Sequence, residues 1–182
     1  MSKHDSRKQQ LLIASSRVLA TNHGASLSEV AAQTGVGRAT LQRYFPKRQD
    51  LLREIALGAL REIDIALDEV LRTDLRPEES LQLMFELLAP IGDRYSYLVT
   101  YPDLMEFAEV ASAYDRQLDR LNRFVQELKQ KELFSPDIPT AWIVQTIDLL
   151  IWGAWYAVDS GSVARNDAAQ LAARTLMRGL GR

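Results

Sequence analysis

Four hydrogen-bonding side chains, Arg38, Thr40, Gln42 and Arg43, lie within one short stretch of this chain. Among the side chains that read DNA, arginine pairs with guanine, glutamine pairs with adenine, and threonine contacts a thymine methyl group or a phosphate. On a helix whose Leu41 faces a core, Thr40, Gln42 and Arg43 point outward. These residue types at this spacing predict a short helix that contacts base edges in the major groove.

The surrounding segment, residues 26–45, has the punctuation needed to position such a helix. Ser26-Leu27-Ser28-Glu29 fits a capping box, in which serine and glutamate satisfy each other's amides at a helix start. Gly35 favours the left-handed conformation that closes a helix and turns the chain. A second helix is predicted over residues 38–44, because Pro46 blocks its continuation. Two short helices joined in this way predict a helix-turn-helix.

A second set of polar residues, in and just after this segment, is placed to contact the phosphate backbone. They are Ser26, Ser28, Tyr44, Lys47 and Arg48. Residues 1–53 carry nine Lys or Arg against three acids, a net +6, whereas the remaining residues carry −8. A basic N-terminal part followed by an acidic remainder is typical of a protein that binds DNA through its N-terminal part only. Each arginine also fits an ordinary solvated surface charge.

Helical patterns continue along the whole chain, and alternating strand patterns do not occur. Further helices are predicted over residues 7–23, 48–71, 102–131, 140–159 and 163–180, with another beginning at Pro77. The predicted buried faces are Leu11, Ala14, Ser15 and Val18 on the first, Leu52, Ile55, Ala59, Ile63, Ala66 and Val70 on the second, and Leu81, Met84, Leu88 and Ile91 on the helix from Pro77. The sequence therefore predicts an all-α protein with a DNA-binding domain at residues 3–63 and a helical effector-binding and dimerisation domain at residues 64–182.

The helix predicted over residues 140–159 is apolar on nearly every side, so more than one of its faces must be covered. A membrane span is one interpretation, but Gln145 and Asp148 interrupt the apolar run. We expect instead a helix that packs on its own domain and on a second subunit, together with the stripe of small and apolar residues on the last helix. That stripe is Ala169, Ala172, Ala173, Leu176 and Leu180. The same stripe also fits an ordinary intrachain core.

The body carries enough aromatic residues to line an apolar effector pocket with a few polar groups. The candidates are Phe85, Tyr95, Tyr101, Phe107, Tyr114, Trp152 and Tyr156. Asp148 lies among apolar neighbours and needs a partner if it is buried. That partner is either a cationic ligand flanked by Trp152 or an Arg or hydroxyl of the protein. The aromatics also fit a plain core.

Several chemistries have no support in the sequence. Cysteine is absent and only His4 and His23 occur, with no metal-ligand cluster, phosphate-binding glycine loop or nucleophile signature. We therefore expect no enzyme activity, no metal and no cofactor. The first twenty residues are interrupted by charges and do not form the apolar run of a signal peptide, so we expect a cytoplasmic protein associated with the nucleoid.

The motif at residues 35–52, GVGRATLQRYFPKRQDLL, resembles the recognition helix and following helix start of the tetracycline-repressor (TetR) family of bacterial transcription regulators. The strong match covers about residues 7–60. The resemblance implies an all-helical homodimer of about nine helices that binds a palindromic operator, most often as a repressor. It also implies release of DNA when a small molecule occupies the body. A TetR-like adaptor, whose body contacts another protein and binds no metabolite, is the alternative.

Three positions depart from the family's usual pattern. Gly37 stands where the recognition helix is usually capped by Ser or Thr, and glycine is a tolerable cap. Gln42 replaces a common tyrosine that lies against the DNA backbone, so this position is predicted to read sequence here. Arg48 replaces the lysine that usually opens the next helix, which retains the charge.

Overall fold

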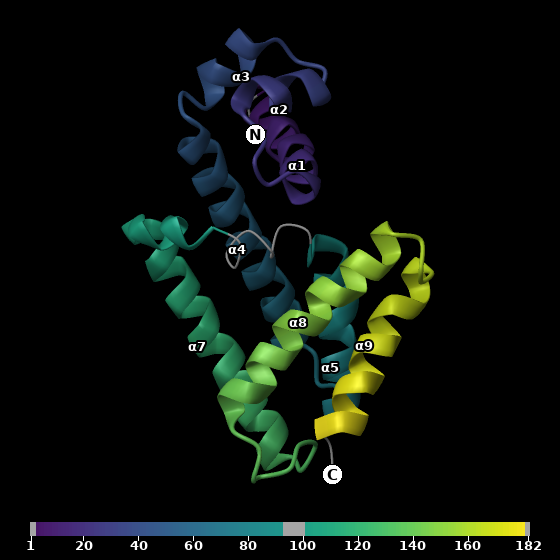
Figure 1. Ribbon diagram of the computed structural model, residues 1–182. Coiled ribbons are helices and arrows are strands. Elements are labelled where there is room, and N and C mark those ends of the chain that lie inside the picture. Colours follow the sequence, from purple (N-terminus) through teal and green to yellow (C-terminus); the bar gives the residue numbers. More distant parts are fainter. Residues whose placement is uncertain (1–2, 93–100, 181–182) are drawn as a thin grey trace. The chain divides into compact units, whose positions relative to one another are not determined.

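The computed structural model describes residues 3–92 and 101–180, and these are helical with no strand among them (Figure 1). Eight α-helices and two short 3-10 helices are present in this part of the chain, which confirms the predicted all-α class. They are α1 (Lys3–Thr21), α2 (Leu27–Gln33), α3 (Arg38–Tyr44), α4 (Arg48–Arg72), α5 (Pro77–Leu88), η1 (Ala89–Ile91), η2 (Pro102–Glu106), α7 (Ala108–Gln130), α8 (Thr140–Asp159) and α9 (Arg165–Leu180).

The contacts of the chain divide it into two compact units. One contains residues 1–59 and 93–111 and is called the head below; the other contains residues 60–92 and 112–182 and is called the body. Helices α4 and α7 each contribute residues to both units. The boundary after residue 59 lies four positions before the predicted end of the DNA-binding domain, and the described residues 101–111 belong to the head although they follow it in sequence.

The head is built as its local signals predict. The amide of Glu29 donates to Ser26 Oγ (3.3 Å) and the amide of Ser26 donates to Glu29 Oε2 (2.8 Å), which completes the capping box of α2. Gly35 closes the turn with φ +69°, a conformation that L side chains rarely adopt. Helix α3 then begins at Arg38 and ends at Tyr44, the predicted bounds.

A small shared core fixes these helices to one another. Leu41 of α3 and Phe45 after it are fully buried beside Val30 and Ala31 of α2. From α1 come Leu11, Leu12, Ser15, Ser16 and Leu19, all buried. The predicted face of this first helix included Ala14 and Val18, which are half-buried, and omitted Leu12 and Leu19. The helix is therefore rotated slightly from its expected orientation.

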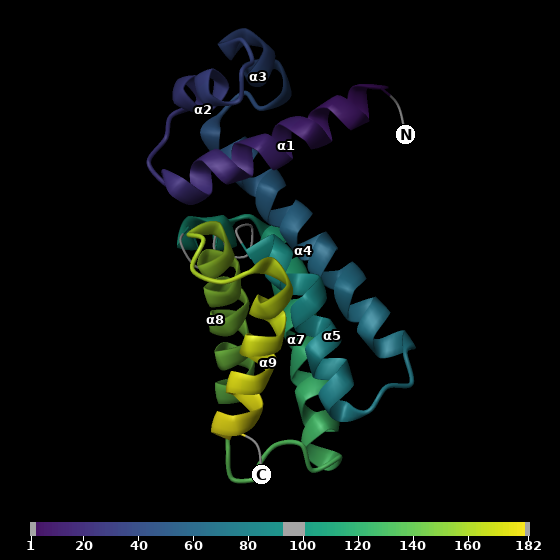
Figure 2. The same ribbon diagram turned by 90° about the vertical axis from the view of Figure 1, so that its right-hand side faces the viewer.

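The body packs the second part of α4 with α5, most of α7, α8 and α9 (Figure 2). Arg120 of α7 binds Asp64 Oδ1 of α4 (2.8 Å) and also Asp68, one turn further along. The predicted stripe of α4 is confirmed, since all six of its apolar residues are buried: Leu52, Ile55, Ala59, Ile63, Ala66 and Val70.

Two expectations about the middle of the chain need correction. The single helix predicted from Pro102 to about residue 131 is two elements, because η2 ends at Glu106 and α7 starts at Ala108. Phe107 has extended backbone (φ −80°, ψ 111°), which an uninterrupted helix cannot contain. Ile91 was expected on a continuous helix from Pro77, but that helix ends at Leu88 and Ile91 lies in η1.

Candidate nucleic-acid interface

The outward face of α3 presents the side chains predicted to reach DNA bases. Arg38, Gln42 and Arg43 are exposed and Thr40 is half-exposed, while Leu41 anchors the opposite face in the core. Within the part of the chain that the structure describes, Arg38 and Gln42 make no ion pair or side-chain hydrogen bond. Their donors and acceptors are therefore available to an external partner.

Arg43 is oriented by its neighbour. Its guanidinium lies over the ring of Tyr44, 5.4 Å from the ring centroid. Tyr44 is half-buried and tilts against Phe45, so its own ring is supported by the head core. Stacking of this kind reduces the rotamer freedom of an exposed arginine while it leaves the guanidinium donors free.

The predicted phosphate contacts at the start of α2 are exposed. Ser26 and Ser28 both lie on the surface, and the Ser26 hydroxyl accepts a bond from Glu29, which leaves its proton to donate to a phosphate. The hydrogen bonds from the Ser26 backbone, followed by those with its side chain, lower the pKa of Glu29 below its ordinary value of 4.5. The capping box therefore keeps a carboxylate charged next to the predicted contact.

Lys47 and Arg48 were both predicted to contact phosphates, but their surroundings differ. The Lys47 backbone amide donates to Asp50 Oδ2 (2.9 Å) and its side chain is exposed. The Arg48 side chain instead turns into the head, where Nε donates to the carbonyl of Ala25 (2.9 Å) and Nη2 contacts the carbonyl of His23. We therefore keep Lys47 in the candidate interface and regard Arg48 as part of the scaffold.

Two more basic residues of the head are also engaged within the protein. Lys8 pairs with Glu54 (3.0 Å), and Arg53 pairs with Glu109 (3.5 Å). The net charge of +6 counted over residues 1–53 consequently overstates the charge that faces a partner. Nothing in the local sequence around Lys8 or Arg53 distinguishes them from the exposed Arg38 and Arg43, because their partners lie far away in the chain.

The aromatic residues predicted to line an effector pocket do not converge on one place. Phe85 is fully buried in the body core, and Tyr95 lies outside the described residues. Tyr101 and Phe107 belong to the head: Arg48 lies over the ring of Tyr101 (5.4 Å), and Arg53 lies over the ring of Phe107 (5.7 Å).

The remaining four candidates lie in the body around one side of α8. Asp148, Trp152 and Tyr156 follow one another at intervals of four residues, and the rings of Trp152 and Tyr156 are stacked (5.5 Å, 18°). Tyr114 of α7 is close enough to interact electrostatically with Asp148. Partial burial, then the charges of Asp148 and Asp115, raise the pKa of Tyr114 above its ordinary 10.0. A carboxylate, a protonated phenol and stacked rings thus share one region, called the Asp148 cluster below.

The residues predicted for a dimer seam on α9 lie inside the body instead. Ala169, Ala172, Ala173 and Leu176 are all buried within the single chain, where α9 packs on α5 and α8, and the side chain of Leu180 lies outside the described residues. Their placement is that of the intrachain core considered as the alternative. Ala169, Ala173 and Leu176 are therefore not a surface that α9 offers to a second subunit.

The exposed apolar surface is on α8. Its buried residues, Ile143, Val144, Ile147, Ile151 and Ala154, lie on one side, and large apolar residues lie on the opposite side. These are Trp142 (58% exposed), Leu149 (69%), Trp152 (43%) and Tyr156 (55%), called the α8 stripe below. Helix α8 is long and apolar enough to cross a membrane by length and composition alone. Only 28% of its most apolar stretch of 18 residues is buried within the chain.

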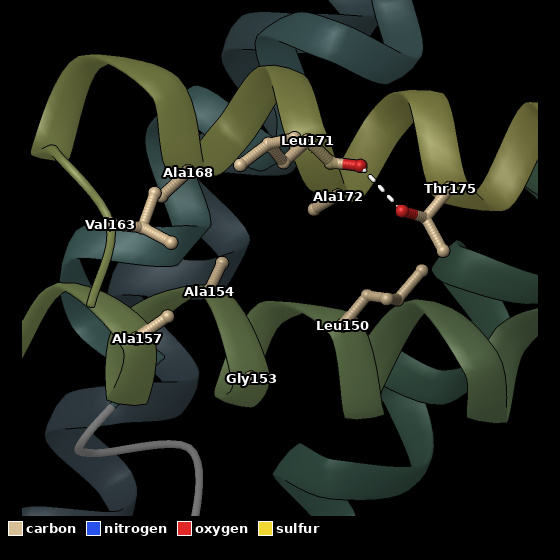
Figure 3. A pocket seen from close by; sticks show the side chains of 9 residues that line it. All are labelled: Leu150, Gly153, Ala154, Ala157, Val163, Ala168, Leu171, Ala172 and Thr175. Carbon is tan, nitrogen blue, oxygen red and sulfur yellow. Dashed lines mark hydrogen bonds between the residues drawn. The ribbon is translucent and has the colours of Figure 1, made fainter. Parts of the chain in front are cut away.

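A groove runs between α8 and α9 (Figure 3). It has a volume of about 170 Å³, and small residues such as Gly153, Ala154, Ala157, Ala168 and Ala172 line it. Leu171 and Thr175 of α9 form its other edge. The groove and the α8 stripe together make a wide apolar surface on the body.

Comparison with known proteins agrees with these features. Residues 16–55 match the family model of bacterial regulatory proteins of the tetR family. The chain is 26% identical over 154 residues to the HTH-type transcriptional repressor LfrR of Mycolicibacterium smegmatis, a match that covers 85% of this chain and 80% of that protein.

Solved structures show the same fold. The TetR-like regulator LfrR from Mycobacterium smegmatis, in complex with proflavine, superposes with a TM-score of 0.76 at 24% identity, covering 100% of this chain and 99% of that one. The ketosteroid transcriptional regulator KstR2 of Mycobacterium tuberculosis superposes with a TM-score of 0.72 at 14% identity, and the match covers 97% of this chain and 95% of that one. Together with the capped helix-turn-helix and its exposed arginines, these matches show a TetR-type helix-turn-helix at residues 16–55 and support a TetR-like transcriptional regulator, whose fold the whole chain shares.

Proposed function

We propose that this regulator is a homodimeric repressor that binds a palindromic operator and releases it when a small cationic aromatic molecule binds the body. The observation that carries the DNA-binding part is the outward face of α3, where Arg38, Gln42 and Arg43 are exposed on a helix whose start and end are both fixed. Arginine suits guanine and glutamine suits adenine, so this face can discriminate bases. Lys47, Ser26, Ser28 and Tyr44 would hold the phosphates.

The α8 stripe supports the homodimer. Exposed large apolar side chains such as Trp142 and Leu149 are unfavourable in water, and a second copy of the same surface would cover them. A symmetric dimer presents two recognition helices to successive major grooves about 34–36 Å apart, which requires a palindromic operator. We therefore assign the seam to Trp142 and Leu149 on the exposed side of α8 together with the groove, and leave Trp152 and Tyr156, on the side of Asp148, to the effector site.

The Asp148 cluster supports a cationic effector. A carboxylate next to stacked aromatic rings attracts a flat cation by charge and by its affinity for the ring faces. The related repressor LfrR has been crystallised with proflavine, which suggests a concrete probe. A repressor of this kind acts in the cytoplasm, where its operator is.

The second candidate is the adaptor, whose body contacts a different protein. The observation that favours it is the breadth of the exposed apolar surface on α8 and α9, which a protein partner could cover. The two candidates differ in their response to a small aromatic cation: the repressor releases its DNA, and the adaptor stays bound.

The proposal is tested with DNA fragments that the protein selects from genomic DNA. Proflavine fluorescence reports binding to the body, and gel shift reports release of the selected duplex. We expect Asp148→Asn to weaken proflavine binding about tenfold and to require correspondingly more proflavine for release, because a charge-assisted contact is lost. Asp159→Asn, an exposed carboxylate at the end of the same helix, is the control and should behave like the wild type. Unchanged proflavine binding in Asp148→Asn would remove the cluster from the effector site.

A further inference from the structure

The turn between α1 and α2 is held by two side chains that come from elsewhere in the sequence. The hydroxyl of Tyr101 donates to the carbonyl of His23 (2.6 Å), and Arg48 donates to the carbonyls of Ala25 (2.9 Å) and His23. Arg48 also donates to the Tyr101 hydroxyl (3.4 Å) and lies over its ring. Tyr101, Arg48 and these two carbonyls are called the turn clasp below.

The clasp acts on the residues that decide where α2 starts. Ala25 is buried and directly precedes Ser26, whose hydroxyl and amide form the capping box. Gly24 in the turn has no side chain that could rigidify it. Helix α2 in turn packs on α3, so a shift of the turn changes the direction in which the recognition helix faces.

The segment that carries Tyr101 contacts α4 at a second place. Arg53, five positions after Arg48, lies over the ring of Phe107 and pairs with Glu109 at the start of α7. Tyr101, Phe107 and Glu109 thus hold the same short segment of the head against α4.

We propose that Tyr101 is a positioning residue for DNA binding: through the turn clasp its hydroxyl fixes the orientation of the helix-turn-helix. This inference rests on the proposed DNA binding by the head. Tyr101 is proposed to act through the head and not by contact with DNA, because its hydroxyl donates to a carbonyl of the head.

The expected effect is on specific binding. A misoriented recognition helix still meets phosphates, but its side chains no longer align with base edges, so affinity for the preferred sequence falls while affinity for random DNA stays. Loss of one intramolecular hydrogen bond corresponds to about a three- to tenfold change.

Tyr101→Phe keeps the ring over Arg48 and removes only the hydroxyl. Binding is measured to a duplex that the wild-type protein selects and to a random duplex of equal length. We expect about three- to tenfold weaker binding to the selected duplex and no change on the random one. The amide of Ala25, which donates to the carbonyl of Asn22 (3.1 Å), should exchange faster with solvent. Thr73→Val removes a hydroxyl that donates to a backbone carbonyl in the body (Val70, 2.8 Å) and should match the wild type.

The Arg48→Lys variant distinguishes a role of Arg48 in the turn clasp from a direct contact between Arg48 and a DNA phosphate. Lysine keeps the charge but cannot reproduce the forked bonds to two carbonyls, so the clasp predicts reduced specificity and a phosphate contact predicts affinity close to the wild type. Wild-type affinity of Tyr101→Phe for both duplexes, or equal weakening on both, would overturn the inference. Failure of the wild-type protein itself to bind any duplex would refute the proposed function instead.

Discussion

At the scale of single residues, the start of α2 shows how a sequence motif becomes an electrostatic feature. Ser26 and Glu29 exchange hydrogen bonds at 2.8 and 3.3 Å, and the carboxylate remains exposed. Because the pKa of Glu29 is lowered in the folded chain, the charged form stabilises the head. That contribution is present above the ordinary value of 4.5 and is lost as the pH falls through the lower folded value.

The capping box therefore predicts a measurable titration. NMR titration of the Glu29 carboxyl should give a pKa below 4.5 in the wild type, and Ser26→Ala should return it toward 4.5. The same substitution should lower the free energy of unfolding of the head by about 0.5–2 kcal/mol, the usual range for loss of a serine cap. Ser28→Ala, which changes an exposed serine in the first turn of the same helix, is the control. Identical titration of Glu29 in Ser26→Ala and wild type would show that the capping bonds do not form in solution.

At the scale of elements, the turn between α2 and α3 contains two glycines whose backbone conformations differ. Gly35 has φ +69°, and a Cβ added to it would meet only open space, so its backbone conformation alone opposes substitution. Gly37 has ordinary extended backbone (φ −66°, ψ 140°) at the start of α3 and supplies no side-chain cap. The first glycine is required by geometry and the second is not.

Opposite effects should result from substituting them. Gly35→Ala should destabilise the head by about 1–2 kcal/mol, because alanine is strained in the left-handed region. Gly37→Ser should stabilise it by a few tenths of a kcal/mol, because serine can cap α3. Chemical unfolding of both variants beside the wild type measures the two changes. Equal stability of Gly35→Ala and wild type would mean that the turn adopts another conformation.

Local signals account for the elements that the sequence predicted well. The capping box at Ser26, the glycine at position 35 and the proline at position 77 act within one helical turn, so they can be read without a structure. The break at Phe107 was missed because the residues around it keep a helical pattern. Its extended backbone accompanies the contacts with Arg53, a residue more than fifty positions away.

One part of the candidate site could also be predicted from local sequence, and another part could not. The outward face of α3 follows from helical periodicity around Leu41 and needed no knowledge of the fold. The placement of Arg48 and Tyr101 could not be predicted, because their partners are backbone carbonyls of a distant turn. Periodicity also identified the stripe on α9 but not its partner, which is the chain's own α5 and α8.

At the scale of the whole molecule, the unpartnered side of α8 predicts the state of assembly. Leu149 is the most exposed large apolar residue of the α8 stripe, and Ile65 of α4 is similarly exposed (65%) outside it. Leu149→Glu should shift the protein to monomers by placing two carboxylates in a symmetric seam, whereas Ile65→Glu should leave the dimer intact. Sedimentation equilibrium measures both. A Leu149→Glu protein that remains dimeric at the wild-type dissociation constant would locate the seam elsewhere.

The central claim, that the exposed face of α3 reads DNA, is tested most directly by the salt dependence of binding to a selected duplex. The wild-type protein should bind at low ionic strength with log affinity falling linearly against log salt concentration. Arg43→Ala should lose about 1–3 kcal/mol on the selected duplex, whereas Arg174→Ala on α9 should bind as the wild type does. A wild-type protein that binds no duplex at low ionic strength, or an Arg43→Ala protein with unchanged affinity and salt slope, would contradict it.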